Sequence, residues 1–400
     1  MRLELLNKDA VVLEYEYDEE LHAVTGVARL VAHEFAPPAC VSVDGSVTMA
    51  DLAWWWRHRG IPASRPRLER LLETVGLDSV SELVERAMAL SLSDRYWVRP
   101  VGSELRWSDV NFFDNDFSSD LGELTIDPLG GEGSGSHSDD DLMSPNSTVL
   151  GNVPKKWVRL DDGSLRLLKA GVQLYDQDVR NELVACSLYG RLLAADEYVL
   201  YEVVRDVDRE LSSCPNMLGE DEELVSAADL MRCHRRESGF DTYRSVVEAL
   251  CETGLGRPYI EQCLSKLFSC DYLMANFDRH LGNFGLIRDC VTLRYKGFAP
   301  FYDCGNALWC DRRRLSEPSS YGYRPMPFLG GVSESPERQL RLFTDYAWLG
   351  DVDLDAWIKD ALMILSEGGL IPAERLERIR HGMELHVRNF WQHVDKCARL

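Results

Sequence analysis

The chain has 400 residues, of which 45% are hydrophobic and 28% are charged, a composition typical of globular proteins with more than one core. Its formal net charge is −22, from 66 acidic and 44 basic residues. Proteins that bind nucleic acid neutralise phosphates with Lys and Arg, so this balance argues against direct nucleic-acid binding. It also disfavours contact with an anionic membrane surface.

Eleven cysteines are scattered along the chain without a CxxC pair, and the first residues, MRLELLNKDA, lack the features of a signal peptide. No run approaches the roughly 20 apolar residues that a membrane-spanning helix needs. We therefore expect a cytoplasmic protein with no membrane partner, whose cysteines are free thiols buried as small hydrophobic groups.

Residues 1–125 predict a small α/β accessory module. Its strands and helices are expected at residues 11–17, 23–31, 48–57, 65–75 and 79–89. A pair of helices with arginines also fits a helix-turn-helix DNA-binding unit, but the acidic charge balance favours a plain helical module. Trp54, Trp55 and Trp56 are expected to pack in its core.

Residues 126–147 predict a flexible acidic linker or flap. Residues 130–141 consist mostly of Gly, Ser and Asp. Such a segment cannot bury enough apolar surface to order itself. It separates the accessory module from the next region.

Residues 148–218 predict a β-rich lobe. The turn Asp161-Asp162-Gly163 lies between two β-rich runs and indicates a hairpin. The expected elements are strands at residues 156–160, 164–169 and 198–205 and a helix at residues 178–193. The helix is amphipathic, and its expected core positions are Leu183, Cys186, Leu188 and Leu192.

Residues 219–400 predict a mostly helical lobe. Helices are expected at residues 226–236, 243–252, 258–275, 336–349, 353–366 and 373–397. A β-rich lobe followed by a helical lobe is the layout of a bilobal protein-kinase-like fold. The predicted class is therefore α+β, with this bilobal fold preceded by the small α/β N-terminal module.

A polar loop after the helix at 258–275 carries residues suited to phosphoryl transfer. Asn283 follows Asp278 at the spacing found in the catalytic loops of kinases. A carboxylate there orients the attacking hydroxyl and accepts its proton, and an amide oxygen holds a metal. Asp303, in Tyr-Asp-Cys-Gly at the end of a later strand, supplies a second metal ligand of the type that Mg²⁺ prefers.

The pattern Asn276-x-Asp278-x-His280-x-x-Asn283 resembles the catalytic loop of HipA-like serine/threonine kinases, the toxin kinases of bacterial toxin–antitoxin systems. The string formed by residues 278–283 is also similar to that of phosphoinositide kinases. The resemblance implies that Asn276 contributes to cofactor binding. We count His280 among the catalytic residues, with bracing of the loop favoured over proton abstraction.

The resemblance extends to the β-rich lobe. Lys169 matches the strand lysine that holds the α- and β-phosphates of ATP, and Glu182 is its candidate partner on a helix. Asn216 falls where the adenine-binding hinge is expected.

Residues 147–156 resemble the family's phosphate-contacting loop. Gly151 is its single glycine. In the family this loop carries an autophosphorylated serine three residues before a glycine. Thr148 occupies that place here and Ser147 lies beside it, so either is the candidate acceptor. A phosphate would add nearly two negative charges and could eject the loop from the cleft.

The resemblance implies an ATP- and Mg²⁺-dependent serine/threonine protein kinase that modifies itself and a protein substrate. By the same resemblance, the substrate is expected in the translation machinery, and an antitoxin or regulatory partner is expected. Two alternatives remain within this fold: a nucleotide-binding pseudokinase with a regulatory role, and a phosphoinositide-kinase-like lipid kinase. A DNA-associated regulator is a third, which the net charge disfavours.

Overall fold

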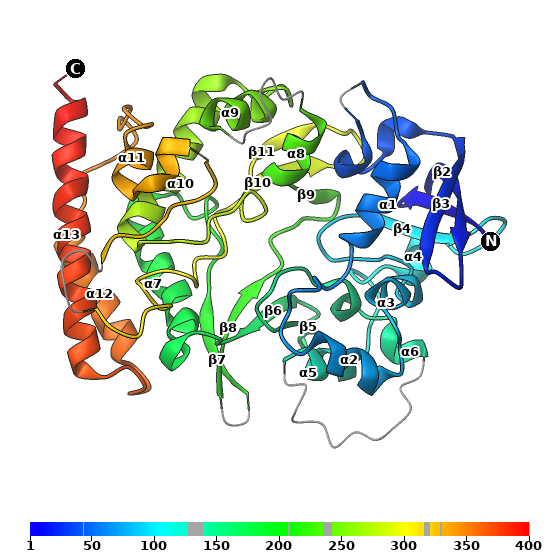
Figure 1. Ribbon diagram of the computed structural model, residues 1–400, viewed down its shortest axis with the longest axis horizontal. Helices are drawn as coiled ribbons and strands as arrows, with labels where there is room; N and C mark the ends of the chain where they lie inside the picture. Colours follow the sequence, from blue (N-terminus) through cyan, green and yellow to red (C-terminus); the bar gives the residue numbers. More distant parts are fainter. Residues whose placement is uncertain are drawn as a thin grey trace.

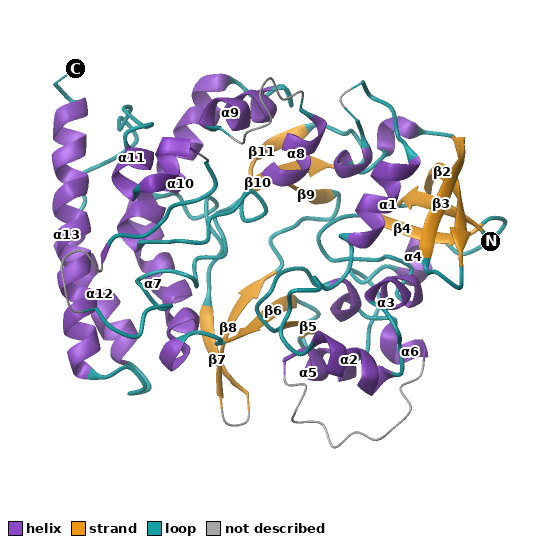
Figure 2. Cartoon of the chain, in the orientation of Figure 1, coloured by secondary structure: helices purple, strands orange, loops and turns teal. Residues whose placement is uncertain are grey.

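The computed structural model describes residues 1–42, 44–126, 139–206, 209–234, 242–315, 321–328 and 330–399. Figure 1 shows the N-terminal strands and the C-terminal helices at opposite ends of the molecule. Figure 2 shows the same division by type of structure, because long helices gather on the C-terminal side. This arrangement confirms the predicted mixture of antiparallel sheets and helices. No helix in the described part of the chain is both long and apolar enough to cross a bilayer.

A four-stranded antiparallel sheet forms the base of the N-terminal module. Its order is β3-β2-β1-β4, from β1 (Arg2–Asn7), β2 (Ala10–Asp18), β3 (Ala23–Leu30) and β4 (Tyr96–Pro100). Tyr15 and Tyr17 share one face of β2, as the two-residue period of a strand requires. Their rings pack on Trp56 of α1 (Met49–Arg57), at centroid distances of 6.5 and 5.1 Å. Trp55 and Trp56 are both buried, which confirms their predicted role in packing.

Short helices follow β3 and β4. Between β3 and β4 of this sheet lie α1, α2 (Leu68–Val75) and α3 (Val80–Arg86), and between β4 and the next sheet lie α4 (Trp107–Val110), α5 (Asp120–Ile126) and α6 (Asp139–Leu142). Thr48 and Asp51 form a capping box at the start of α1, each side chain accepting a hydrogen bond from the other's backbone N–H. α5 packs on β5 (Lys155–Arg159), where the Thr125 hydroxyl donates to the Lys155 carbonyl at 3.0 Å. The predicted accessory module is thus continuous with the lobe that follows.

Part of the predicted linker is folded. Residues 127–138 lie outside the described residues, but residues 139–147 form α6 and a 3₁₀ turn, η3 (Pro145–Thr148). Leu142 is buried in a cluster with Leu71 and Leu83, and the Asn146 side chain accepts a hydrogen bond from the Trp157 N–H at 2.7 Å. One buried leucine and a set of polar bonds order this end of a segment whose composition predicts flexibility.

The second sheet has the order β5-β6-β8-β7 and is antiparallel. Its remaining strands are β6 (Leu165–Ala170), β7 (Glu202–Asp206) and β8 (Arg209–Pro215). The predicted hairpin is confirmed as β5 and β6, with Lys155 opposite Lys169. The expected strand at 198–205 begins only at Glu202.

Helix α7 (Gln177–Leu192) packs beside the second sheet, and its expected core was partly wrong. Leu188 is buried, but Leu183, Cys186 and Leu192 are only partly buried. The fully buried face is Val184, Ala185, Leu188 and Tyr189. Leu183 and Cys186 instead line a smaller cluster around Tyr201.

The third sheet has the order β11-β10-β9, from β9 (Glu222–Ser226), β10 (Gly285–Asp289) and β11 (Tyr295–Phe298). The helices around it are α8 (Ala227–Cys233), α9 (Tyr243–Cys251), α10 (Arg257–Met274), α11 (Pro336–Leu340), α12 (Leu354–Ser366) and α13 (Ala373–Cys397). The helix expected at 336–349 ends at Leu340. Beyond it, Phe343 and Tyr346 keep a helical spacing, but the Asp345 side chain accepts from the Ala347 N–H at 2.9 Å and stabilises a turn instead.

Buried polar bonds attach the N-terminal module to the third sheet. Arg288 on β10 pairs with Glu223 on β9 at 2.5 Å and donates to the Tyr96 hydroxyl of β4 at 2.7 Å. Arg95 donates to the carbonyls of Gly219 and Glu220 at 2.6 and 3.0 Å. The two halves of the chain are therefore joined by charge-assisted bonds as well as by apolar packing.

The Arg288 junction gives a stability prediction. Arg288→Met should lower the free energy of unfolding by about 3–5 kcal/mol, because it leaves the buried Glu223 carboxylate without a partner. The double variant Arg288→Met/Glu223→Leu should recover much of that loss, because it removes both charges. Urea denaturation followed by tryptophan fluorescence measures both effects. A double variant that is less stable than Arg288→Met would contradict this account.

Candidate active site

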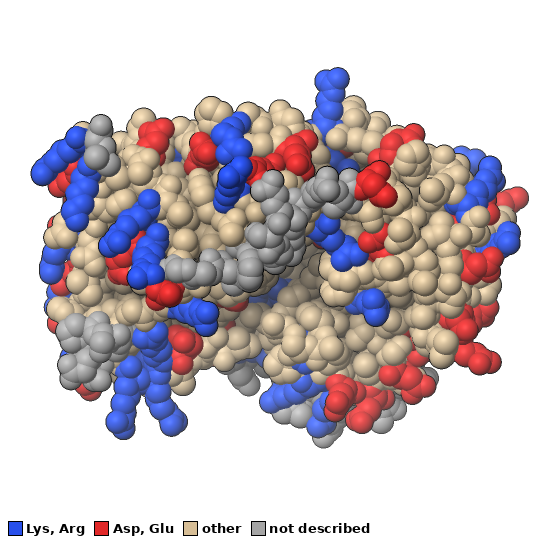
Figure 3. Space-filling view, turned by 45° about the horizontal axis from the view of Figure 1, so that its top comes forward, with Lys and Arg blue, Asp and Glu red and all other residues tan. Residues whose placement is uncertain are grey.

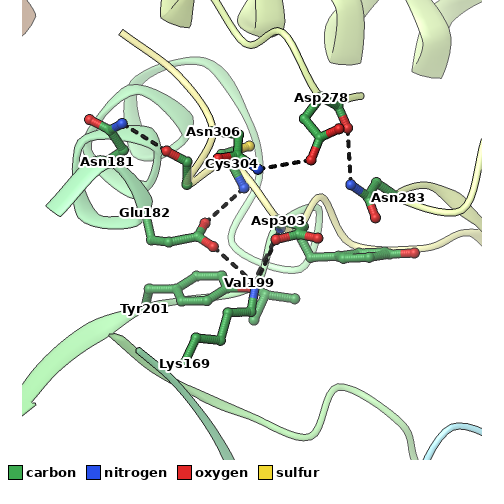
Figure 4. Close-up of polar contacts among 12 residues, drawn as sticks. Lys169, Asn181, Glu182, Val199, Tyr201, Asp278, Asn283, Asp303, Cys304 and Asn306 are labelled. Atoms are coloured by element: carbon green, nitrogen blue, oxygen red, sulfur yellow. Dashed lines mark hydrogen bonds and ion pairs between the residues drawn. The ribbon is translucent and has the colours of Figure 1, made fainter. Parts of the chain in front are cut away.

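Lys169 on β6 lies at the centre of a buried ion-pair network. Its Nζ is 3.0 Å from Glu182 Oε1 on α7 and 2.8 Å from Asp303 Oδ1, and it donates to the Tyr201 hydroxyl at 3.1 Å. Figure 4 shows the ammonium between the two carboxylates. Burial lowers the pKa of Lys169, but Asp303 and Glu182 outweigh it and hold that pKa well above its usual value. Lys169, Glu182 and Asp303, which the sequence analysis singled out, therefore lie in direct contact through the Lys169 ammonium.

Asp303 is held in an uncommon backbone conformation. Its φ is 60°, in the left-handed region that residues other than glycine seldom adopt. Burial raises the pKa of its carboxyl, but Lys169 and Lys155 more than offset this effect and keep the pKa well below its usual range. The carboxylate therefore stays ionised. The next residue is fixed as well, because the Cys304 N–H donates to Glu182 Oε2 at 2.8 Å.

The polar loop after α10 holds Asp278 and Asn283 together. The Asn283 amide donates to the Asp278 carbonyl at 3.0 Å, and the Asn306 amide donates to Asp278 Oδ2 at 2.8 Å. Burial raises the pKa of the Asp278 carboxyl, and the negative charge of Asp303 adds to that rise. Asn306 was not predicted, although it lies only three residues after Asp303, which was predicted as a metal ligand.

Two predicted residues brace this loop from within. Asn276 is buried, its amide nitrogen donates to Asp271 Oδ1 at 2.8 Å, and its amide oxygen accepts from the Asp278 N–H at 3.0 Å. The His280 ring accepts from the Gly282 N–H at 3.1 Å through Nδ1. Both side chains thus use their polar atoms on neighbouring residues of the loop, which for His280 agrees with the bracing that was favoured.

Arg279 joins three segments of the site and was not predicted from the sequence. Its guanidinium is buried and makes two bonds to Asp271 of α10, at 2.9 and 3.0 Å. It also donates to the carbonyls of Asn283 and Tyr302, at 2.7 and 2.6 Å, and to Cys304 Sγ at 2.9 Å. One side chain therefore ties α10, the polar loop and the segment of Asp303 together.

Residues 147–154, here called the phosphate loop, directly precede β5 in the chain. Gly151 has φ +93°, and a Cβ there would lie 2.6 Å from Lys155 Nζ, so only glycine fits. Ser147 and Thr148 are buried, and their hydroxyls donate to the carbonyls of Leu142 and Leu90, each at 2.6 Å. Both predicted acceptors are thus enclosed in this conformation.

Asn216 follows the end of β8, close to the N-terminal module. Its backbone N–H donates to the Leu165 carbonyl at 2.9 Å, and its side chain donates to the Leu92 carbonyl at 3.1 Å. The side-chain oxygen accepts from the Leu218 N–H at 3.2 Å. Asn216 therefore fixes the connection between the second and third sheets, where a hinge was expected.

Lys155 is the second buried lysine beside the network, and it was missed as well. It lies opposite Lys169 on the hairpin, and no carboxylate of the described residues lies within ion-pair distance of its Nζ. Burial lowers its pKa from 10.5 to about 8. The hairpin was predicted, but its first strand was expected to begin at residue 156, so the place of Lys155 opposite Lys169 was not seen.

The oxygen atoms available here suit a hard divalent cation. Asp303 offers an ionised carboxylate, and Asn283 keeps its side-chain oxygen while its nitrogen bonds the Asp278 carbonyl. No cluster of three or more His, Cys, Asp and Glu side chains with metal-binding geometry occurs in the described ranges. These two residues fit Mg²⁺ provided that a ligand's phosphates and water complete its coordination. Figure 3 shows a hollow near the middle of one face of the molecule.

Lys155 gives a prediction with a defined pH dependence. Lys155→Met should raise the free energy of unfolding at pH 7, by up to about 3 kcal/mol, because it removes a buried charge whose pKa is about 8. The gain over wild type should shrink as the pH rises from about 8 to 10.5, where the wild-type lysine loses its proton in the folded and then in the unfolded state.

Urea denaturation at pH 7 and pH 10 measures the difference. Lys156→Met is the matched control, because Lys156 pairs with Glu123 and Asp206 at 2.7 and 3.0 Å and its removal should not stabilise the protein. A Lys155→Met variant that is less stable than wild type at pH 7 would contradict the assignment of an unpaired buried charge.

Comparisons with known proteins bear on this geometry. No family model matches the sequence. The serine/threonine-protein kinase CtkA of Helicobacter pylori is 29% identical over 140 residues, which are 34% of this chain and 42% of CtkA. The chain thus matches less than half the length of this relative.

Two solved structures are similar to the chain. One is a chain of the Shewanella oneidensis toxin–antitoxin complex of HipA, HipB and operator DNA, with a TM-score of 0.58 and 14% identity over 100% of this chain and 99% of that one. The other is the H. pylori proinflammatory kinase CtkA, with a TM-score of 0.48 and 17% identity over 61% of this chain and 94% of that one. The sequence match to CtkA and the likeness to the HipA complex support the resemblance drawn from the catalytic loop, and the chain has a HipA-like kinase fold.

Proposed function

We propose that the chain is an ATP- and Mg²⁺-dependent serine/threonine protein kinase of HipA-like type. The observation that carries the proposal is the ion-pair network in which Lys169 lies between Glu182 and Asp303. Asp278 lies near this network, since the negative charge of Asp303 raises the pKa of the Asp278 carboxyl. A lysine, a helix glutamate, a metal-ligand aspartate and a loop aspartate are the parts that phosphoryl transfer between ATP and a hydroxyl requires.

In this proposal each side chain has a defined task. Lys169 binds the α- and β-phosphates as a point charge, and Glu182 keeps its ammonium in place. Asp303 and Asn283 hold Mg²⁺, which when bound supplies neutralisation of the charge that develops on the phosphates. Asp278 orients the acceptor hydroxyl and takes its proton, and its raised pKa makes it a better base than an exposed aspartate.

The supporting residues keep these groups in register. Asn306 holds one oxygen of Asp278 and leaves the other available to a substrate. Arg279 fixes the polar loop to the segment of Asp303, so that the base and the metal ligand move together. Cys304, which stands where many kinases have phenylalanine, is packed and bonded by Tyr189 and Arg279, and its replacement therefore does not argue for an inactive protein.

Autophosphorylation at Thr148 or Ser147 is part of the proposal. Because both hydroxyls are buried and bonded to carbonyls, transfer requires the phosphate loop to leave the position described above. A phosphorylated loop would not return easily, since a dianion cannot replace a neutral hydroxyl in an enclosed site.

The substrate and partners are proposed more coarsely. The likeness to CtkA supports a protein substrate, and the expectation of a target in the translation machinery is carried over from the family resemblance. In the related Shewanella structure HipA is bound to HipB and operator DNA, which motivates a search for an antitoxin or regulatory partner of this chain.

Transfer of labelled phosphate tests the proposal. With Mg²⁺ and γ-labelled ATP, wild type should phosphorylate itself or a general protein substrate, and Asp278→Asn and Asp303→Asn should each reduce the rate by at least about 100-fold. Asp161→Asn, at the exposed turn of the hairpin, is the control and should retain full activity. Mass spectrometry of the product locates the phosphate.

Three outcomes would change the proposal. Binding of ATP without transfer would favour the regulatory pseudokinase, and transfer to a phosphoinositide but not to protein would favour a lipid kinase. Failure of wild type to bind ATP would refute both kinase assignments.

A further inference from the structure

An arginine of the N-terminal module reaches the phosphate loop. Arg65 lies just before α2 and is only 4% exposed. Its Nε and Nη2 donate to the Gly151 carbonyl at 2.9 and 2.6 Å, and Nη2 also donates to the Val149 carbonyl at 2.7 Å. A residue far away in the sequence therefore fixes the backbone on both sides of Leu150.

The charge of Arg65 has no ion-pair partner in the described part of the chain. No Asp or Glu of the described residues lies within ion-pair distance of its guanidinium, and Nη1 is buried without a hydrogen-bond partner. Burial lowers the pKa of Arg65 to about 10. A buried cation without a counter-ion is costly, so it seldom persists unless a ligand or partner neutralises it.

A second buried cation, which has no ion-pair partner among the described residues, lies close by. Lys155 Nζ lies beneath Gly151, the same residue whose carbonyl Arg65 holds. Burial lowers the pKa of Lys155, the charge of Asp303 partly offsets this effect, and the positive charges of Lys169 and Arg65 lower it further, so the three cations share one neighbourhood. Asp303 and Glu182 form their ion pairs with Lys169 and not with Lys155. The excess of positive charge around the loop is that of a binding site for a polyanion.

Other bonds join the module to the same loop. The Ser64 hydroxyl donates to Asn152 Oδ1 at 2.5 Å, and the Thr148 hydroxyl donates to the Leu90 carbonyl at 2.6 Å. Arg65, Ser64 and Leu90 all belong to the N-terminal module. The loop is thus held along its length by a part of the chain that carries none of the predicted catalytic residues.

We propose that Arg65 makes the N-terminal module part of the nucleotide site, by positioning the phosphate loop and by supplying positive charge to the polyphosphate of the nucleotide. This inference rests on the proposed kinase function and deepens it. Through Arg65 the module then affects the affinity for the phosphates and not for the base, because the side-chain hydrogen bonds of Arg65 go to the loop. Arg65 is a positioning residue in this scheme, since it acts on the nucleotide through the loop and through its charge.

Calorimetric titration of the full chain with Mg²⁺-ATP, ADP and adenosine tests the inference. Arg65→Met should weaken the binding of ATP and ADP at least tenfold and leave adenosine binding unchanged. Arg65→Lys keeps the charge but loses the two-point hold on the loop, so its ATP affinity should lie between those of wild type and Arg65→Met. Arg70→Met, on the exposed face of α2, is the matched control and should bind all three ligands as wild type does.

Comparing the binding of ATP and adenosine shows which of the two proposals a negative result would overturn. Equal ATP affinity of wild type and Arg65→Met would overturn the inference and leave the proposed kinase intact. An equal loss of ATP and adenosine binding would overturn it too, because it would indicate general loosening of the site. Should Arg65→Met not fold, the Arg65→Lys variant decides: weaker ATP binding with unchanged adenosine binding supports the inference, and wild-type ATP affinity refutes it. Failure of wild type to bind any nucleotide would overturn both proposals.

Discussion

The ammonium group of Lys169 is the point at which the lobes of this protein meet. It belongs to β6, it pairs with Glu182 of α7, and it pairs with Asp303 on the segment that follows β11. Removing Lys169 leaves the buried Glu182 carboxylate and that of Asp303 without their cation, which costs far more than the pairs themselves contribute. The network therefore specifies how the hairpin, the helix and the Asp303 segment are placed, even where it adds little net stability.

Around that network lie two buried cations that have no ion-pair partner among the described residues. Arg279 and Arg288 are paired with Asp271 and Glu223, as buried arginines in stable folds usually are. Arg65 and Lys155 are not paired with any described carboxylate, and both have pKa values lowered by burial. The contrast separates arginines that hold the fold together from the two cations on which the proposed binding of a polyphosphate rests.

The sequence predicted local features well and long-range contacts poorly. The hairpin of β5 and β6, the long α13 and the loop with Asp278 and Asn283 follow from turn residues, periodicity and spacing, which act over a few positions. Arg65 and Arg279 were missed, because their importance lies in partners that only the folded chain brings near. The pairing of Lys169 with Glu182 was expected only through the family resemblance, and its pairing with Asp303 was not predicted.

The predicted division into domains also missed contacts between residues that are far apart in the sequence. The acidic Gly/Ser segment predicts a boundary near residues 126–147, and a boundary in composition suggests two independent units. Contacts cross it instead: Thr125 bonds β5, Leu142 packs with α2 and α3, and Arg65 holds the phosphate loop. An insertion need not weaken such contacts, because the entropy of closing a loop grows only slowly with its length. The contacts therefore join the residues before and after the segment into one packed unit.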